Sequence, residues 1–181
     1  PSLDKIDNEI AKIIKDFKCE VEPSLNRTLW DLSRIKKNDQ SPYKVFTPFF
    51  KNGCLKQQKP QSPFELKVYN FKLIDDSEQI DDILPVLNYK WANDLLKKWD
   101  ITELGGIRQL EAFLKNKLLN YKKGRDYPEL NSISKLSPYI HFGQVSVRQI
   151  YHQLMKCKDS ENKSHFLSEL GWREFSYYLL Y

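Results

Sequence analysis

The sequence predicts a mainly α-helical protein, preceded by the tail of an α/β unit and by an irregular connector. From about residue 77 onward, apolar residues recur every three or four positions, which is the period of an amphipathic helix. Between residues 40 and 80, four prolines and a polar run interrupt any regular period. Near the amino end, a helical pattern leads into a short extended run, as at the end of an α/β unit. These observations divide the chain into three zones.

The first zone, residues 1–40, begins with a helical pattern. Its apolar residues fall at positions 3, 6, 10, 13, 14 and 17. A short extended run at residues 19–22 follows and is closed by Pro23. We therefore expect this zone to be the carboxyl-terminal tail of an α/β domain. Because Pro1 is not a native start, we also expect the chain to begin inside a longer protein.

The second zone, residues 41–80, is expected to be an interdomain connector that lies on the surface. Prolines, which fix the backbone and lack an N–H donor, recur through it. One aromatic cluster, at residues 46–50, interrupts this polar stretch. We expect these aromatic side chains to anchor the connector to the rest of the molecule.

The third zone, residues 81–181, is expected to be the amino-terminal half of a helical domain. One predicted helix face consists of Ile107, Leu110, Leu114, Leu118 and Tyr121. Ser146 and Gln149 form a capping box, which predicts that a helix begins there. The chain stops at Tyr181 within a helical pattern and without a stop signal, so we expect it to end inside a longer protein. The tryptophans expected to anchor the core of the molecule are Trp30, Trp91 and Trp99.

The turn before Ser137 is one candidate site. Ser137 suits the N-cap of a short helix, Pro138 suits its first position, and Gly143 suits the residue past its end. One interpretation is a capped helix with no further role. The other is a phosphate site, because the hydroxyls of Ser134 and Ser137 and the cation of Lys135 gather at a helix start. The chain has no Gly-x-Gly-x-x-Gly or Walker motif, which excludes a nucleotide held in the Rossmann manner.

The last helical pattern carries a polar stripe. Residues three and four apart share a helix face, and the stripe consists of Glu169, Trp172, Arg173 and Ser176. The rest of this helix is mostly apolar, and burying a carboxylate and a guanidinium without partners is costly. We therefore expect the stripe to bind a ligand. The alternatives are that Trp172 is a core residue and that Glu169 is a solvated residue paired with Arg173.

Charge and composition limit the classes of function. The net charge of +5 favours an anionic partner such as nucleic acid, although lysine-rich proteins of every function reach this value. The three cysteines show neither metal-ligand nor pairing spacing and indicate reduced thiols in a cytoplasmic protein. No apolar run reaches the roughly 18 residues of a membrane span. The three histidines are too scattered for a metal site, and His141 is expected to be packed and hydrogen-bonded.

Four sequence motifs, in their order and spacing, resemble the photolyase/cryptochrome family. They are PYKVFTPF at residues 42–49, YKKGRDYP at residues 121–128, SKLSPYIHFG at residues 134–143 and ELGWREF at residues 169–175. The resemblance spans nearly the whole chain. It implies that residues 1–40 are the tail of an α/β antenna domain and residues 41–80 the connector. Residues 81–181 would then be the first half of a helical FAD-binding domain.

The resemblance also implies a role for each matching residue. The residues that match the family's flavin contacts are Tyr121, Ser134, Lys135, Leu136, Ser137, Phe166 and Arg173. Glu169 and Trp172 match the pair that meets the damaged bases and are the implied catalytic residues. The implied DNA-binding residues are Glu169, Trp172, Arg173 and Ser176. We expect the acid and the indole to face, side by side, a hollow that they share with the flavin.

Three positions depart from the family's pattern. Ile133 stands where members commonly have Thr, which removes one possible hydrogen bond to phosphate. Lys135 stands where they commonly have Arg, so the charge is kept and the bidentate fork is lost. Phe166 stands where Trp is common.

The function implied by the resemblance is that of a deoxyribodipyrimidine photo-lyase, which repairs cyclobutane pyrimidine dimers by electron transfer from reduced FAD. It implies UV-damaged DNA as the partner, a monomer, and a folate or deazaflavin antenna chromophore in the full-length protein. A cryptochrome-type photoreceptor shares the fold and the flavin and is the main alternative. A member that acts on the other major photoproduct and an interaction module without flavin are further alternatives. Glu169 and Trp172 together favour repair.

Overall fold

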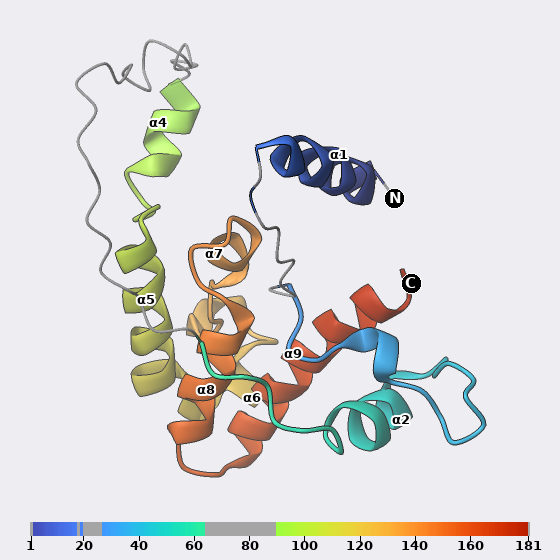
Figure 1. Ribbon diagram of the computed structural model, residues 1–181. Helices are drawn as coiled ribbons and strands as arrows, with labels where there is room; N and C mark the ends of the chain where they lie inside the picture. The colour runs from blue at the N-terminus through green and yellow to red at the C-terminus, as the bar shows by residue number, and fades with distance from the viewer. Residues whose placement is uncertain (1, 18, 20–26, 64–89, 181) are drawn as a thin grey trace.

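The computed structural model describes residues 2–17, 19, 27–63 and 90–180, and all regular structure in these ranges is helical (Figure 1). The α-helices are α1 (Ser2–Asp16), α2 (Phe46–Pro48), α4 (Lys90–Leu96), α5 (Glu103–Ala112), α6 (Tyr121–Gly124), α7 (Ser137–His141), α8 (Val147–Lys156) and α9 (Glu161–Tyr178). Short 3-10 segments lie at Leu32–Arg34, Leu118–Asn120 and Pro128–Leu130, and π-helical turns at Phe49–Cys54 and Phe113–Lys117. The prediction of a mainly α protein is confirmed for these residues. None of the helices described is long and apolar enough to cross a membrane.

Helix α1 coincides with the first helical pattern of the sequence. Its periodic residues Ile6, Ile10 and Ile13 share one face, which is exposed to solvent in the described structure. Of the expected extended run at residues 19–22, all but the first residue lie outside the described residues.

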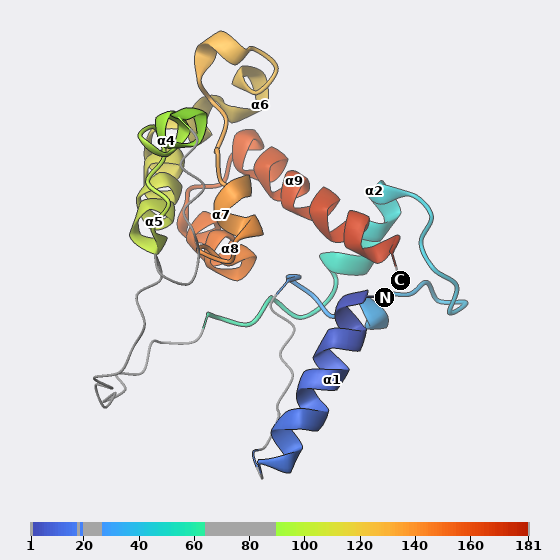
Figure 2. The same cartoon turned by 90° about the horizontal axis from the view of Figure 1, so that it is seen from above.

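Helix α9 is the centre of the fold. It packs against α6, α8 and the segments Phe49–Cys54 and Leu32–Arg34. Figures 1 and 2 show its amino half beside α6 and α8 and its carboxyl half beside α2. Its buried residues Phe166, Leu170 and Phe175 belong to one continuous apolar core. Helix α9 therefore contacts segments of the described chain both before residue 64 and after residue 90.

Residues 46–54 are helical, although we expected them to belong to an irregular connector. Phe46, Phe49 and Phe50 lie three and four positions apart, so one helical face carries all three rings. This face packs against α9, and burial of the aromatic surface stabilises the helix there. The part of the expected connector beyond residue 63 lies outside the described residues.

The predicted apolar face that begins at Ile107 lies on an interrupted helix. Leu110, Leu118 and Tyr121 of this face are buried, as its period requires. A π-helical turn begins at Phe113 and a 3-10 turn follows before α6. The wider π turn changes the register, and Phe113 is fully buried although the pattern did not select it.

The helix caps around α7 and α8 agree only partly with the prediction. The capping box is confirmed, because the hydroxyl of Ser146 accepts the N–H of Gln149 while the Gln149 side chain accepts the N–H of Ser146. Ser137 was expected to be an N-cap but is the first residue of α7, since Leu136 already has helical backbone angles. Gly143 follows the helix with a φ of 74°, which favours glycine there.

Two residues expected to be packed are exposed. Trp30 is buried and the ring of Trp99 packs near Tyr139, as core residues should. Trp91, in contrast, is 64% exposed, because α4 extends beyond the core (Figure 1). His141 is exposed as well, since it is the last residue of α7 and borders a cavity.

Candidate functional site

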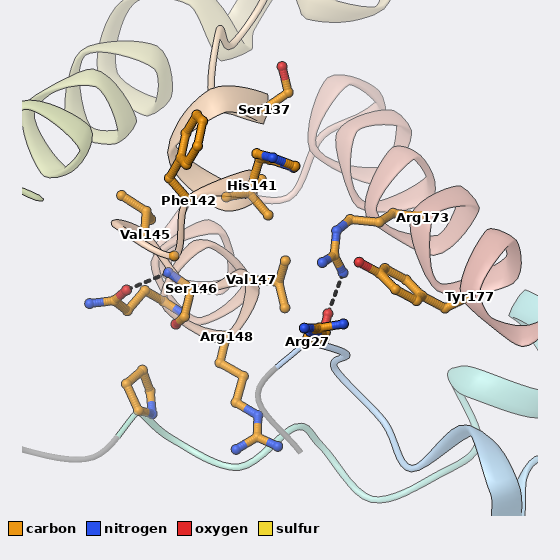
Figure 3. Close-up of a pocket in the computed structure, with 14 residues that line it drawn as sticks. Arg27, Ser137, His141, Phe142, Val145, Ser146, Val147, Arg148, Arg173 and Tyr177 are labelled. Carbon is orange, nitrogen blue, oxygen red and sulfur yellow. Dashed lines mark hydrogen bonds between the residues drawn. The ribbon is translucent and has the colours of Figure 1, made fainter. Parts of the chain in front are cut away.

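A cavity of about 810 Å³ lies between α7, the start of α8 and α9 (Figure 3). Ser137 and His141 border it from α7, and Arg148 borders it from α8. Arg173 enters from α9, and Arg27 enters from the amino-terminal part of the chain. The cavity is therefore assembled from segments that are far apart in the sequence.

The wall of this cavity is positively charged. Its described lining contains three arginines and no carboxylate. The guanidinium of Arg173 lies over the ring of Tyr177, 4.8 Å from the ring centroid, and its Nη1 donates to the carbonyl oxygen of Arg27 at 2.5 Å. Ser137 and Ser146 add hydroxyl groups. Guanidinium and hydroxyl donors around one cavity suit an anionic ligand such as a phosphate.

Glu174 lies behind Arg173 and ties the amino-terminal segment to α9. Its fully buried carboxylate accepts the backbone N–H of Leu29 at 2.8 Å and that of Trp30 at 3.5 Å. Burial raises the pKa of Glu174 to about 7, and the amide of Leu29 and the charge of Arg173 oppose this rise. Because this tie fixes residues 29 and 30, it also fixes the nearby carbonyl of Arg27 that holds Arg173.

The turn before α7 does not present all its residues to the cavity. Ser137 lines it, whereas Leu136 is buried in the core and leaves only its backbone for a ligand. The carbonyl of Ser134 accepts the side-chain N–H of Gln109 at 2.7 Å, which fixes the turn to α5. Lys135 is exposed and has a φ of 54°. A non-glycine residue with such a left-handed backbone costs about 1–2 kcal/mol, and such strain is often found at functional sites.

Two other residues that match flavin contacts lie in the core. Tyr121 and Phe166 are buried, and their ring centroids are 5.1 Å apart in an edge-to-face arrangement. Both rings also pack against Phe113, at 5.5 Å and 4.6 Å. Neither residue lines the cavity. Their side chains support the junction between α6 and α9.

Glu169 lies near this aromatic cluster and is held by basic side chains. Its carboxylate forms an ion pair with Arg125, which follows α6, and Nε2 of His165 lies 3.9 Å from the same oxygen. The hydrogen bond with Glu169 raises the pKa of Arg125. Glu169 thus pairs with Arg125 and not with Arg173, because the guanidinium of Arg173 turns to the carbonyl of Arg27.

Trp172 lies flat against Phe46 of α2. The ring centroids are 3.8 Å apart and the planes are inclined by 12°. Trp172 is nevertheless 46% exposed, so it is not a core residue. Since Phe46 covers one face of the indole, its exposed surface lies on the other side. The exposed Ser176 next to it uses its hydroxyl to donate to the Trp172 carbonyl at 3.0 Å.

The structure brings some of the expected site residues together and separates others. Ser137 and Arg173 meet at the cavity, whereas Glu169 and Trp172 are absent from its described lining. The residues that the sequence reasoning did not assign to a site are Arg27, Phe46, Arg125 and Arg148. Phe46 and Arg125 lie within the sequence motifs, which was a usable signal. Arg27 and Arg148 reach the cavity only through the tertiary fold.

Known proteins are similar to this chain in sequence and in fold. A family model described as DNA photolyase matches residues 1–67. The deoxyribodipyrimidine photo-lyase of Alkalihalophilus pseudofirmus is 32% identical over 157 residues, which cover 81% of this chain and 31% of the relative. The crystal structure of a bacterial class III photolyase from Agrobacterium tumefaciens matches 97% of this chain with 28% identity and a TM-score of 0.83. The chain is thus similar to members of the photolyase/cryptochrome family over most of its length.

The family contains both photolyases and cryptochromes that are similar to this chain. Cryptochrome-1 of Arabidopsis thaliana is 30% identical over 152 residues, which cover 76% of this chain and 22% of that protein. The chain spans 31% of the length of the Alkalihalophilus photolyase and 38% of the Agrobacterium structure. The Agrobacterium photolyase therefore has a similar helical fold over the 38% of its chain that this protein matches.

Proposed function

We propose that the protein is a deoxyribodipyrimidine photo-lyase, which repairs cyclobutane pyrimidine dimers in DNA with light and reduced FAD. The observation that carries this proposal is the half-exposed indole of Trp172, covered on one face by Phe46 and one helical turn from Glu169. An open aromatic face beside a hydrogen-bonding carboxylate suits a pair of pyrimidines that has left the base stack.

The cavity between α7, α8 and α9 fits the anionic part of FAD. Arg27, Arg148 and Arg173 supply positive charge, and Ser137 supplies a hydroxyl group. We propose that these residues hold the diphosphate. Bound, reduced and excited by light, FAD supplies the electron that splits the dimer. The protein residues bind and orient the partners of this reaction.

Trp172 is proposed to receive the dimer after it leaves the duplex. Extruding bases costs a few kcal/mol, and less for a lesion that already stacks badly. Stacking on an aromatic side chain returns about 1–3 kcal/mol per base. The two energies are similar, so stacking on Trp172 can offset the extrusion of a lesion, and an intact site, whose extrusion costs more, is offset less completely.

Glu169 and Arg125 are proposed to act as a pair on the dimer. The carboxylate of Glu169 is placed to accept hydrogen bonds from a pyrimidine edge, and its ion pair with Arg125 limits its rotation. The guanidinium also places a positive charge near the group that acquires negative charge during repair. Loss of this cation should therefore slow repair without removing the cofactor.

The finer assignments of the chain are part of the same proposal. Residues 1–40 are proposed to be the tail of an antenna domain, residues 41–80 a connector and residues 81–181 half of the FAD-binding domain. The other residues that match flavin contacts would shape the FAD site through backbone groups or from behind it. They are Tyr121, Ser134, Lys135, Leu136 and Phe166. The proposal also includes UV-damaged DNA as the partner, an antenna chromophore in the full-length protein, a monomeric state and a cytoplasmic location. Support comes from the photolyase relatives.

The second candidate function is that of a blue-light photoreceptor. The similarity to Cryptochrome-1 of Arabidopsis thaliana favours it, since the two chains share 30% identity over 152 residues. A photoreceptor would hold FAD but would not clear dimers from DNA. The two candidates therefore differ in one measurable outcome.

The test is light-dependent loss of cyclobutane dimers from irradiated DNA, measured with the full-length protein and two arginine variants. We expect Arg173→Gln to lower the FAD content, because it removes a charge from the cavity. We expect Arg125→Gln to keep FAD and slow repair about tenfold or more, since a hydrogen bond to a charged group contributes about 1.5–3 kcal/mol.

Each result has a defined meaning. A yellow protein that leaves dimers intact in the light would refute repair and favour the photoreceptor. A protein that binds no flavin would refute both. If Arg125→Gln lost FAD as readily as Arg173→Gln, the separation of a cofactor cavity from a lesion site would be wrong.

A further inference from the structure

Trp172 is the outer member of a stack of aromatic rings. Phe46 lies beneath it, with ring centroids 3.8 Å apart and planes inclined by 12°. Phe50 lies beneath Phe46, at 5.4 Å and 11°. The planes are nearly parallel, and the stack runs from buried Phe50 through Phe46 to the half-exposed indole.

A glycine allows this stack to lie against α9. A Cβ atom at Gly171 would lie 2.5 Å from the ring of Phe50, much closer than side chains approach in proteins. Glycine weakens the interior of a helix, so a residue other than glycine would be expected here on propensity alone. The ring of Phe50 occupies the space of the missing side chain and explains the glycine.

The segment that carries the stack is anchored independently of Trp172. Phe49, its fully buried neighbour, packs against Phe175 at 5.1 Å and Tyr178 at 4.7 Å between ring centroids. Figures 1 and 2 show α2 beside the carboxyl half of α9 in both views. Phe46 is therefore a fixed surface against which the indole of Trp172 rests.

We infer that Phe46 is a positioning residue for Trp172 and sets the plane on which the damaged bases stack. This inference rests on the proposed function. An exposed indole without a neighbour samples several rotamers, and ordering it at the moment of binding costs free energy. Stacking on Phe46 removes that cost in advance and leaves one face open. Phe46 thus contributes to the preference for damaged DNA without contacting it.

The experiment compares leucine variants of Phe46 and Phe49, two aromatic residues three positions apart, in the full-length protein. Phe46→Leu keeps apolar volume but removes the flat face under Trp172. Phe49→Leu is the matched control, because it makes the same chemical change in the core without touching the indole. Binding to an oligonucleotide with one thymine dimer and to its undamaged copy is measured for each. Phe46→Tyr tests rescue by another flat ring.

The expected result is a change in selectivity. We expect Phe46→Leu to reduce the preference for the dimer about two- to tenfold, which corresponds to one aromatic pair. Phe46→Tyr should keep the preference of the parent, and Phe49→Leu, which loosens the segment but leaves the flat ring under Trp172, should keep much more of it than Phe46→Leu. Equal preferences in Phe46→Leu and the parent, or equal losses in both leucine variants, would overturn the inference. A parent protein with no preference would refute the proposed function instead.

A second readout follows the indole directly. Acrylamide quenching of Trp172, obtained as the difference between each protein and its Trp172→Phe derivative, reports how much of the ring is accessible. Phe46→Leu should increase this quenching because both faces become reachable, and Phe49→Leu should not. Unchanged quenching in Phe46→Leu would show that Phe46 does not position the indole.

Discussion

Glu169, Arg173 and Glu174 of α9 form two groups that point to different parts of the molecule. Arg173 and Glu174 face the amino-terminal segment, where they hold the carbonyl of Arg27 and the amide of Leu29. Glu169, one turn earlier, faces Arg125. Glu169 and Arg173 are four residues apart and share one side of the helix, so they are separated by about one turn along the axis and by the partners to which their side chains turn.

Glu174 should make the stability of the protein depend on pH. Its pKa is raised from 4.5 to about 7, so the folded state holds the proton more tightly than the unfolded chain does. The free energy of unfolding should therefore fall as pH rises from about 4.5 to about 7, by about 3 kcal/mol. Glu174→Gln, which cannot ionise, should flatten this dependence. Denaturant titrations at several pH values measure it.

Glu161 provides the control for this effect. It lies on the same helix, is exposed, and has a lowered pKa because of its hydrogen bond to Lys122. Its contribution to stability is lost only as pH falls below about 4.5, outside the relevant range. Glu161→Gln should therefore leave the slope between pH 4.5 and 7 unchanged. A parent whose stability does not change over this range would contradict the role of Glu174.

Helices of this fold could be predicted from the sequence where a local pattern, such as a helical period or a capping box, is sufficient to form them. The pattern that begins at residue 3 gave α1, and the spacing of Ser146 and Gln149 gave the start of α8. The aromatic cluster at residues 46–50 was recognised, but its helical form was missed, because prolines and polar residues surround it and only packing against α9 stabilises the helix. The burial of Phe113 was missed because a π-helical turn breaks the period.

The packing of the segment Phe49–Cys54 against α9 makes Gly171→Ala a test of this pair of elements. Alanine favours a helix interior over glycine by about 1 kcal/mol, so an isolated helix would be stabilised. Here the new Cβ would meet the Phe50 ring at 2.5 Å, and overpacking costs about 1–3 kcal/mol. We expect a net loss of stability, measured as a lower Tm. Ser164→Ala, at an exposed position of α9, should not lower it; a higher Tm for Gly171→Ala would refute the close packing.

At the scale of the whole molecule, the candidate cavity is formed by residues that are far apart in the sequence. The cavity needs Arg27 and Arg173, and no local pattern relates two such positions. The sequence motifs predicted Ser137 and Arg173, which line the cavity, and Trp172, whose role stays a prediction, because a motif records residue types at fixed spacing. They did not indicate the support that Phe46 gives to Trp172, since that contact depends on how two segments pack.

Tyr178 is a further long-range tie, and its removal should weaken the whole molecule. Its hydroxyl donates to the carbonyl of Ile35 at 2.8 Å and accepts the N–H of Tyr43 at 3.1 Å. Tyr178→Phe keeps the ring that packs on Phe49 but leaves both backbone groups without this partner, so we expect a loss of about 1 kcal/mol in the free energy of unfolding. Tyr127→Phe, at an exposed position, should have no such effect. Hydrogen exchange adds a local readout, because the amide of Tyr43 should lose protection in Tyr178→Phe. Unchanged protection there would mean that aromatic packing alone holds the segment around Tyr43 to α9.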